Sequence, residues 1–320
     1  MGTPLLWIGF NLFVLASIAL DLGVFNRRLH KVSVREAGFF SLLWVVLSIL
    51  FGLGVLHYSG RQAGLEFFTG YLIEKALSVD NLFLFLVIFR TFAVDERFQH
   101  RMLEWGILGA LVMRGVMILA GAELIERFSW VLYVFGAFIV YAAIHMLFVK
   151  KETVHPEKSF IFRFASKHLR VTHDYKGEHF FVRSGKKLYA TPLFLVLLVV
   201  EITDITLAID SIPAIFGITQ DPFIVYTSNV FAILGLRAMY FLLAGVLNRL
   251  RFLTVGLAFV LAFIGGKMIA HKWVDIPEYV SLLIVLGILL FALAASLLFP
   301  VREETSKGAS NQAGEKAKLD

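Results

Sequence analysis

Apolar segments long enough to cross a membrane recur along almost the whole chain of 320 residues. A helix that spans the hydrocarbon core of a bilayer needs about 20 consecutive, mainly apolar residues. Nine such segments are predicted, at residues 4–25, 36–57, 67–91, 102–122, 128–149, 191–217, 222–246, 253–270 and 277–300. Only 17% of the residues are charged and 58% are hydrophobic, which is unlike a soluble domain. The sequence therefore predicts an all-α polytopic membrane protein whose surroundings are the lipid bilayer.

Basic residues gather on one side of the predicted helices. The connections after the first, third, fifth, seventh and ninth helices hold 23 Lys and Arg residues if Arg90, in the last turn of the third helix, is counted with them, whereas those on the other side hold three. The positive-inside rule then predicts an inner (plasma) membrane protein with its N-terminus outside and its C-terminus in the cytoplasm. The net charge of +6 is spread over these connections and not over one face of a soluble fold, so no nucleic-acid partner is expected.

Two segments outside the helices have their own composition. Residues 150–190 form a long basic loop with an amphipathic stretch at 160–169, which we interpret as a cytoplasmic loop lying partly on anionic headgroups. The alternative is that this loop binds a protein partner. Residues 301–320 have few apolar side chains and are predicted to be a disordered cytoplasmic tail.

Two of the predicted helices carry related acidic motifs. Residues 70–85 are GYLIEKALSVDNLFLF and residues 198–216 are LVVEITDITLAIDSIPAIF. Each motif has an acid, five intervening residues, an Asp, and then Asn or Ser. The corresponding residues lie 130 positions apart, and they are Glu74 with Asp204, Asp80 with Asp210, and Asn81 with Ser211.

The similarity continues into the helices that follow. Arg114 corresponds to Arg237 at an offset of 123, and His145 to Lys267 at an offset of 122. Helices three to five are therefore predicted to be a duplicate of helices six to eight. Three helices separate each residue from its counterpart, so the two copies are inverted, as in many secondary transporters. The predicted parts are two N-terminal helices (1–66), the first repeat (67–149), the loop (150–190), the inverted repeat (191–270), the ninth helix (271–300) and the tail (301–320).

Charged residues inside the predicted helices need partners. An ionisable side chain at the bilayer centre costs at least about 2.5 kcal/mol, so it usually faces an opposite charge or a wet cavity. We interpret Arg114 and Arg237 as members of structural ion pairs between helices, and Lys267 as a structural or gating residue. The acids outnumber the bases and recur in both motifs, which favours a functional role for them. The predicted metal-handling residues are Glu74, Asp80, Asn81, Glu201, Asp204, Asp210 and Ser211.

The chemistry of these residues narrows the class of metal. The chain has no cysteine, so any metal is bound by oxygen or imidazole. Carboxylates with Asn and Ser form a hard oxygen site, which suits Mg²⁺, Ca²⁺ or Mn²⁺. Glu74, Ser78 and Asn81 share one helix face, whereas Asp80 lies about 120° from Glu74 around an ideal helix. Both acids can meet one ion only if the helix unwinds locally or a second helix contributes ligands.

A proline in the second motif predicts such an unwinding. Pro213 has no N–H to donate to the carbonyl of Ile209, so we expect a helix break there that frees an acceptor beside Asp210. The first motif has no proline or glycine between Gly70 and Arg90. No break is predicted for that helix.

Three stretches of this sequence resemble the TerC family of membrane proteins, within the LysE-like transporter superfamily, and most closely its Alx-like members. The resemblance is carried by EKALSVDN (74–81), EITDITLAIDSIPAIF (201–216) and TSNVFAILGLRAMYFLLAG (227–245). It implies manganese export from the cytoplasm. The acids that the resemblance implies as metal-handling residues are Glu74, Asp80, Glu201, Asp204 and Asp210. Leu207 stands where many relatives are expected to have Phe, a change that leaves these acids unaffected.

The leading functional hypothesis is a secondary transporter that exports a divalent cation, most favourably Mn²⁺, in exchange for protons. The chain has no Walker A motif for ATP and no HExxH motif of a metallohydrolase, so neither an ATP-driven pump nor an enzyme is expected. No bound cofactor is expected beyond the transported ion. The alternative is a membrane scaffold or chaperone that assists metal handling through the 150–190 loop.

Overall fold

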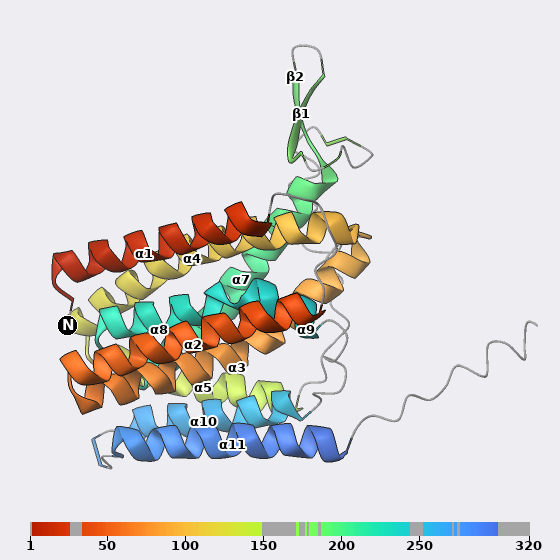
Figure 1. Cartoon of the computed structure of the whole chain (residues 1–320). Coiled ribbons are helices and arrows are strands. Elements are labelled where there is room, and N and C mark those ends of the chain that lie inside the picture. The colour runs from red at the N-terminus through yellow and green to blue at the C-terminus, as the bar shows by residue number, and fades with distance from the viewer. Residues whose placement is uncertain are drawn as a thin grey trace, which may run out of the picture.

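Every apolar segment predicted from the sequence contains a helix in the computed structural model of the chain (Figure 1). The structure describes residues 2–25, 34–148, 171–172, 177, 179–184, 187–243, 252–270, 272–273 and 276–299. The elements are α1 (Pro4–Phe25), α2 (Val34–Tyr58), α3 (Arg61–Thr91), α4 (Glu96–Arg127), α5 (Val131–Phe148), β1 (Phe181–Ser184), β2 (Lys187–Ala190), α7 (Pro192–Phe216), α8 (Pro222–Leu234), α9 (Leu236–Leu243), α10 (Leu253–Ala270) and α11 (Glu278–Leu298).

The all-α polytopic fold is confirmed. Among the described residues, seven helices are long and apolar enough to cross a membrane, with α8 and α9 counted together as one span. The other two predicted positions are occupied by α1, which is apolar, and by α3, which is 31 residues long but carries several charges. The nine predicted segments and the observed helices therefore correspond one to one, except that the seventh is divided.

Two helices begin earlier than the apolar runs predict. α3 starts at Arg61 and not at residue 67, and its first turns are held by polar contacts: the buried Glu66 accepts hydrogen bonds from Gln62 and from Thr219, which follows α7. α4 starts at Glu96 and not at residue 102, and its first turn is capped by Asp95, whose carboxylate accepts from the backbone N–H of Arg97 at 3.0 Å.

The helix break expected at Pro213 is not present, and that prediction is wrong. α7 continues through Pro213 to Phe216. The proline lies in the last turn of the helix, where its own carbonyl still accepts from Gly217 N–H at 3.0 Å. A proline so close to a helix end removes one hydrogen bond without disturbing a long run of helix. α3 is likewise continuous across its motif.

A break occurs instead between α8 and α9, in a segment predicted to be one helix. It is centred on Gly235, and the ammonium of Lys75 in α3 lies against it, because a Cβ at this position would be 2.7 Å from Lys75 Nζ. Lys75 donates to the carbonyl of Ala232 at 3.3 Å, near the C-terminus of α8. The negative end of a helix dipole stabilises a cation, so the division of the helix gives this buried Lys a partner.

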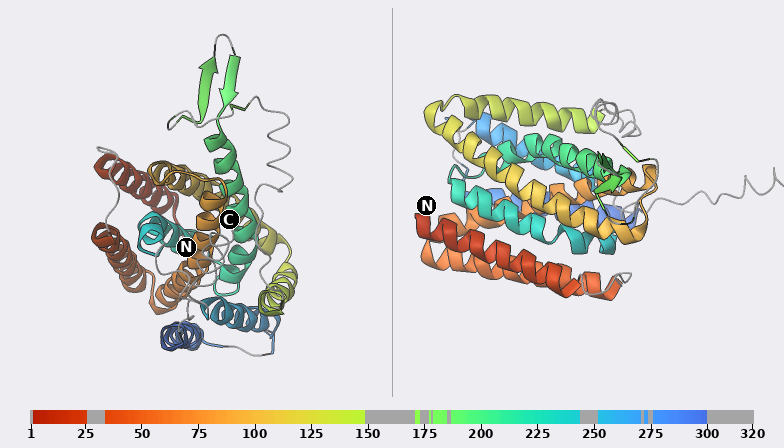
Figure 2. Two further views of the ribbon diagram at one scale, coloured as in Figure 1. Left: turned by 90° about the vertical axis from the view of Figure 1, so that its right-hand side faces the viewer. Right: turned by 90° about the horizontal axis from the view of Figure 1, so that it is seen from above.

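The central helix is α8, whose residues from Phe223 to Leu234 are all buried. Around it, α3 packs on α8, α4 packs on α7, and α5 packs on α10. Figure 2 shows α7 and α8 inside the bundle and α1, α2, α5 and α11 at its periphery. In the predicted repeats α3 corresponds to α7, α4 to α8 with α9, and α5 to α10. A twofold axis that exchanged the repeats would turn the α3–α8 pair into the α7–α4 pair, and it would leave the α5–α10 pair in place. The inverted repeat stays a prediction, and this packing is the arrangement that it requires.

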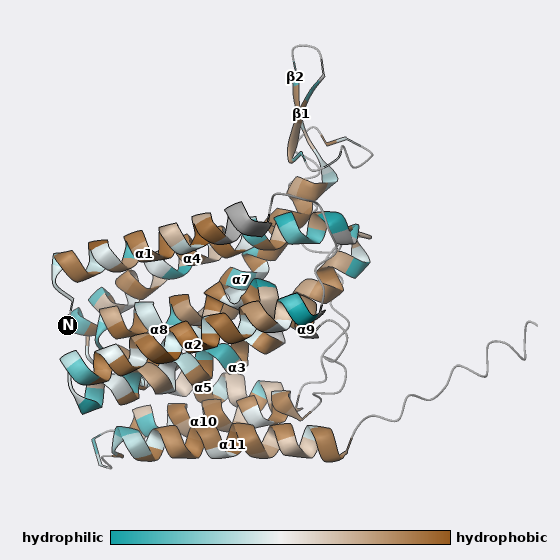
Figure 3. Cartoon of the chain, in the orientation of Figure 1, coloured by the Kyte–Doolittle hydropathy of each residue, from teal (hydrophilic) through white to brown (hydrophobic). Residues whose placement is uncertain are grey.

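Peripheral helices expose apolar side chains in the manner of a lipid-facing surface. In Figure 3 the brown of hydrophobic residues covers most of the length of α1, α2, α10 and α11. Leu5 of α1, Leu42 of α2 and Phe291 of α11 are 79%, 62% and 78% exposed, which would be unfavourable in water. The lipid bilayer is the environment in which such a surface is stable.

An antiparallel hairpin of β1 and β2 projects from one end of the bundle, which we call the hairpin end (Figure 1). The hairpin lies within the predicted 150–190 loop. The last residues of α11 lie at the same end, and the N-terminus lies at the opposite end, as nine crossings require. The amphipathic stretch at 160–169 and the tail at 301–320 lie outside the described residues, and which end faces the cytoplasm stays a prediction.

Single cysteines introduced into this cysteine-free chain test the orientation. Ser59 lies at the opposite end and Lys187 lies in the hairpin, and both are exposed. We expect a membrane-impermeant thiol reagent added to intact cells to label Ser59→Cys and to leave Lys187→Cys unlabelled until the membrane is permeabilised. The reverse labelling pattern would invert the predicted topology.

Candidate cation site

Arg114 lies in the middle of α4 and joins the two predicted repeats. Its guanidinium donates to Asp204 of α7 through Nε to Oδ2 at 3.2 Å and through Nη2 to Oδ1 at 3.0 Å. Nη1 forms an ion pair with Glu74 of α3 and lies 3.5 Å from the amide oxygen of Asn229 in α8. One arginine thus holds the corresponding acids of both motifs.

Burial makes this cluster electrostatically strong. Arg114, Glu74, Asp204 and Asn229 are between 0% and 4% exposed. With both carboxylates ionised, the three charged residues carry one negative charge in excess. In a low-dielectric interior an uncompensated charge attracts a cation far more strongly than it does in water.

Several buried polar atoms on the helices of this cluster have no hydrogen-bond partner within the described part of the chain. They belong to three of the four helices that form the cluster, and they are Glu74 Oε2, Ser78 Oγ, Ser211 Oγ and Asn229 Nδ2. Buried polar atoms are normally paired, so such atoms mark positions where water or an ion can be bound. Three of the four are oxygen atoms, the ligands that a hard divalent cation prefers.

The predicted metal-handling residues are distributed unevenly over this cluster. Glu74 and Asp204 are held together by Arg114, whereas Asn81 and Ser211 are buried on α3 and α7. The structure does not describe the side chains of Asp80 and Asp210, although their backbone is helical. Within the described side chains, no three His, Asp or Glu residues are grouped as ligands of one metal.

Glu201 lies one helical turn before Asp204 and is partly buried. Its carboxylate lies against Gly109 of α4, in the space that a Cβ at this position would occupy. The glycine therefore lets a charged group approach the backbone of α4 closely. Glu201 makes no ion pair among those recorded for the described residues, so it remains a candidate ligand beside the Arg114 cluster.

Each of the other two basic residues predicted to be structural has a partner that is an acid outside the motifs. Arg237 of α9 donates to Glu104 of α4 at 2.9 Å, and the same Glu104 oxygen lies 3.3 Å from His100 Nε2. Lys267 of α10 donates to Glu278 of α11 at 2.7 Å. Arg237 and Lys267 thus each join two helices through an acid that the motifs do not contain.

Several residues of these networks were not singled out from the sequence, among them Asn229, Glu104, Glu278 and Glu66. Asn229 lies in the stretch TSNVFAILGLRAMYFLLAG and could have been chosen as a polar residue in an otherwise apolar helix. Glu104 is an acid near the start of a predicted helix, and Glu66 lies one residue before another. The signal that could have identified Glu66 is a four-residue spacing of polar residues on α3. These residues are Gln62, Glu66, Glu74 and Ser78, with Gly70 at the position between Glu66 and Glu74.

Comparison with known proteins identifies the family of the chain. The family model described as "Integral membrane protein TerC family" matches residues 59–304, which include all the residues of the cluster. The chain belongs to the TerC family. The match begins at the connection before α3 and continues past α11, so it covers the part of the chain in which the repeats and the ninth helix are predicted.

Similar TerC relatives cover nearly the full length of this chain. A membrane protein of Myxococcus xanthus, STKORF319, is 49% identical over 299 residues, which is 93% of each chain. Alx of Escherichia coli K12, which is named as a proposed membrane-bound redox modulator, is 46% identical over 96% of this chain and 99% of its own. A membrane protein of Rickettsia bellii is 41% identical over 91% of this chain and 97% of its own. No solved structure matches the chain.

Removal of the central guanidinium should destabilise this TerC protein strongly. Arg114→Gln leaves two carboxylates buried beside each other, and breaking a buried ion pair from one side costs about 3–5 kcal/mol. Arg127→Gln is the matched control, because Arg127 and its partner Glu123 are 70% and 57% exposed and such a pair contributes about 0–1 kcal/mol. We expect thermal unfolding of the purified protein in detergent to occur at a clearly lower temperature for Arg114→Gln alone. Equal midpoints for the two variants would mean that Arg114 is not the structural centre of the cluster.

Proposed function

We propose that this TerC protein is a secondary transporter that exports a divalent cation from the cytoplasm, with Mn²⁺ as its principal substrate. The observation that carries this proposal is the ion pair of Arg114 with one acid from each predicted repeat, in the buried centre of a membrane bundle. Transporters built from inverted repeats bind their substrate near the bilayer midplane, where the repeats meet. The Arg114 cluster lies at such a junction and carries excess negative charge.

Oxygen ligands in this cluster support a hard cation. Carboxylates of Glu74, Asp204 and Glu201, with the hydroxyls of Ser78 and Ser211, are the groups that Mn²⁺, Mg²⁺ and Ca²⁺ prefer. Among these ions we favour Mn²⁺, because the resemblance to the TerC family implies manganese export. The sequence also contributes Asp80 and Asp210, which follow these residues on α3 and α7.

Arg114 has a defined role in this mechanism. In the absence of metal its guanidinium compensates carboxylates of both repeats, so that the empty site can change its access without exposing two bare charges to a low-dielectric interior. A bound divalent cation would replace part of that compensation and weaken the link between α3 and α7. The ion pair thereby couples occupancy of the site to the relative position of the two repeats.

Exchange with protons is the proposed source of energy. Carboxylates bind metals in their deprotonated form, so metal binding releases protons and protonation releases metal. A carrier whose acids are protonated from outside, as the metal leaves, would move the two ions in opposite directions. The absence of a Walker A motif from the sequence agrees with a carrier that does not use ATP.

The redox function in the name of Alx and the scaffold hypothesis are the competing proposals. The chain has no cysteine, so its own side chains cannot perform thiol–disulfide exchange, and an effect on cellular redox state would be indirect. A scaffold acting through the 150–190 loop would keep its effect when the motif acids are neutralised. Sensitivity to those acids therefore separates a carrier from a scaffold.

Neutralisation of the second acid in each motif should abolish export. Asp80→Asn and Asp210→Asn keep the size of the side chain but remove the charge that binds a divalent cation, so cells that depend on this protein for Mn²⁺ export should accumulate Mn²⁺. Lys272→Gln, in an exposed connection at the opposite end, is the control and should export normally. Cellular Mn²⁺ content after a metal challenge is the measurement, with the amount of protein in the membrane checked in parallel. Normal export by both Asn variants would reject the mechanism.

A further inference from the structure

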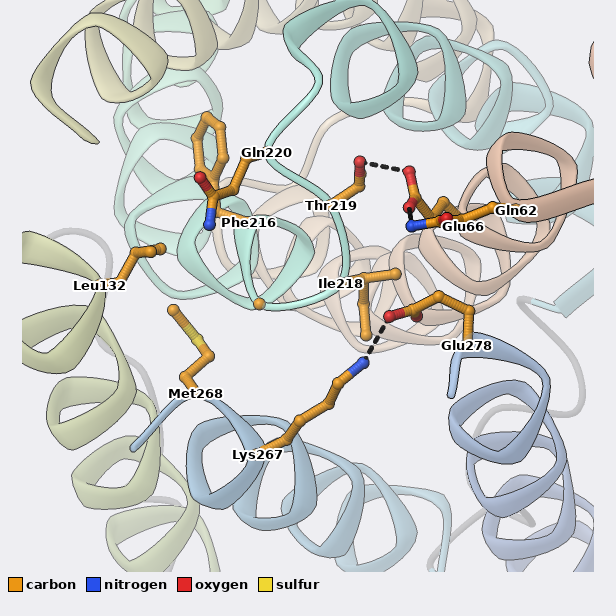
Figure 4. Close-up of a pocket in the computed structure, with 11 residues that line it drawn as sticks. Gln62, Glu66, Leu132, Phe216, Ile218, Thr219, Gln220, Lys267, Met268 and Glu278 are labelled. Atoms are coloured by element: carbon orange, nitrogen blue, oxygen red, sulfur yellow. Dashed lines mark hydrogen bonds and ion pairs between the residues drawn. The ribbon is translucent and has the colours of Figure 1, made fainter. Parts of the chain in front are cut away.

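A cavity of about 300 Å³ opens at the end of the bundle opposite the hairpin. It lies among the start of α3, the connection from α7 to α8, the end of α10 and the start of α11 (Figure 4). Its polar lining is formed by Gln62, Glu66, Thr219, Gln220, Lys267 and Glu278. By the predicted topology this is the outer side of the membrane.

Two carboxylates in the cavity are fixed by neighbouring polar groups. Glu66 is 9% exposed, and its oxygens accept from Gln62 Nε2 at 3.0 Å and from Thr219 Oγ1 at 2.6 Å. Across the cavity, Lys267 Nζ donates to Glu278 at 2.7 Å and to Ser281 at 3.0 Å. Figure 4 shows these two pairs on either side of Ile218. Two acids and one base leave the cavity with one negative charge in excess.

A polar stripe on α3 connects this cavity with the Arg114 cluster. Gln62, Glu66, Gly70, Glu74 and Ser78 follow one another at intervals of four residues, which places them along one slowly rotating face of the helix. At 1.5 Å per residue, Glu66 and Glu74 are about 12 Å apart along the helix axis. The stripe therefore extends from the outer cavity to the centre of the bundle.

The two ends of this stripe differ in packing. Between them Gly70 touches α8, where a Cβ would be 2.9 Å from Ser228 Oγ, so the stripe is closed at this level. At the inner end, Glu74 Oε2 and Ser78 Oγ are buried and have no hydrogen-bond partner among the described residues. A closed contact between two polar regions is the arrangement expected of a pathway that is shut on this side.

We propose that the cavity is a second, outer binding site for the divalent cation, in which Glu66 and Glu278 receive the ion after it leaves the Arg114 cluster along the α3 stripe. This inference rests on the proposed function for the direction of movement. Lys267 acts there as a resident cation that competes for Glu278, because an ammonium at hydrogen-bond distance offsets the attraction of that carboxylate for metal. Weak binding is what an exit site needs if the ion is to be released.

The test uses Mn²⁺ alone, which quenches a nearby fluorophore. Gln220 is exposed and lines the cavity, so Gln220→Cys in the cysteine-free chain can be labelled and the full-length protein reconstituted in nanodiscs. We expect saturable quenching by Mn²⁺. Glu66→Gln should weaken Mn²⁺ binding at least about tenfold, and Lys267→Gln should strengthen it, because the first change removes a negative charge and the second a positive one. Glu123→Gln removes an exposed acid of α4 that lies at the same end of the bundle as the cavity, and it should leave the Mn²⁺ titration unchanged.

The outcomes distinguish this site from the proposed function. Glu66-dependent quenching in a protein that moves no Mn²⁺ would reject the transporter and keep the outer site. Mn²⁺ transport with quenching that is equal in Glu66→Gln, Lys267→Gln and the unmodified cavity would reject the outer site and keep the transporter. If Glu66→Gln elutes as aggregated protein, Glu278→Gln takes its place, and unchanged Mn²⁺ binding by that variant would likewise overturn the proposal.

Discussion

The bidentate contact of Arg114 with Asp204, extended by the ion pair with Glu74, is the interaction on which the centre of this bundle depends. Two carboxylates without a base would be strongly destabilising at this depth in the membrane, and a lone guanidinium would be as well. Because α3, α4 and α7 each contribute one charged group, the three helices must stay in register for any of the charges to be compensated. Asn229 adds α8 to the same contact.

The remaining bases inside the bundle, which are buried or partly buried, follow the same rule with different partners. Lys75 lies at the C-terminal end of α8, Arg237 pairs with Glu104, and Lys267 pairs with Glu278. These contacts neutralise charge locally and hold neighbouring helices together. The Arg114 cluster differs because one base is shared between acids of both motifs and because the buried Glu74 Oε2 and Ser78 Oγ have no partner among the described residues. These acceptor atoms are what makes the cluster the candidate central site.

The positions of the helices could be predicted well from the sequence, because every helix that crosses a bilayer needs about 20 mainly apolar residues. The sequence also predicted that Arg114 and Arg237 form ion pairs, but which acids pair with them depends on which helices pack together: Arg114 contacts Glu74 and Asp204, and Arg237 contacts Glu104. Neither backbone prediction for the second repeat was correct: Pro213 is too close to the end of α7 to break it, whereas Gly235 divides the next helix. Lys75 lies against this division, and it is distant in sequence and comes close only in the folded bundle. Glu66 was missed because a polar helix start interrupts the apolar pattern used to place α3.

The central claim is that this TerC protein itself carries a divalent cation across the membrane. The most direct measurement is Mn²⁺ flux into liposomes that contain the purified protein and a pH-sensitive dye, with the membrane potential clamped. The account predicts Mn²⁺ movement down its gradient that exceeds the leak of empty liposomes, with protons moving in the opposite direction. Mn²⁺ flux without proton movement would leave a uniporter and withdraw only the exchange. Mn²⁺ flux equal to that of empty liposomes would contradict the account.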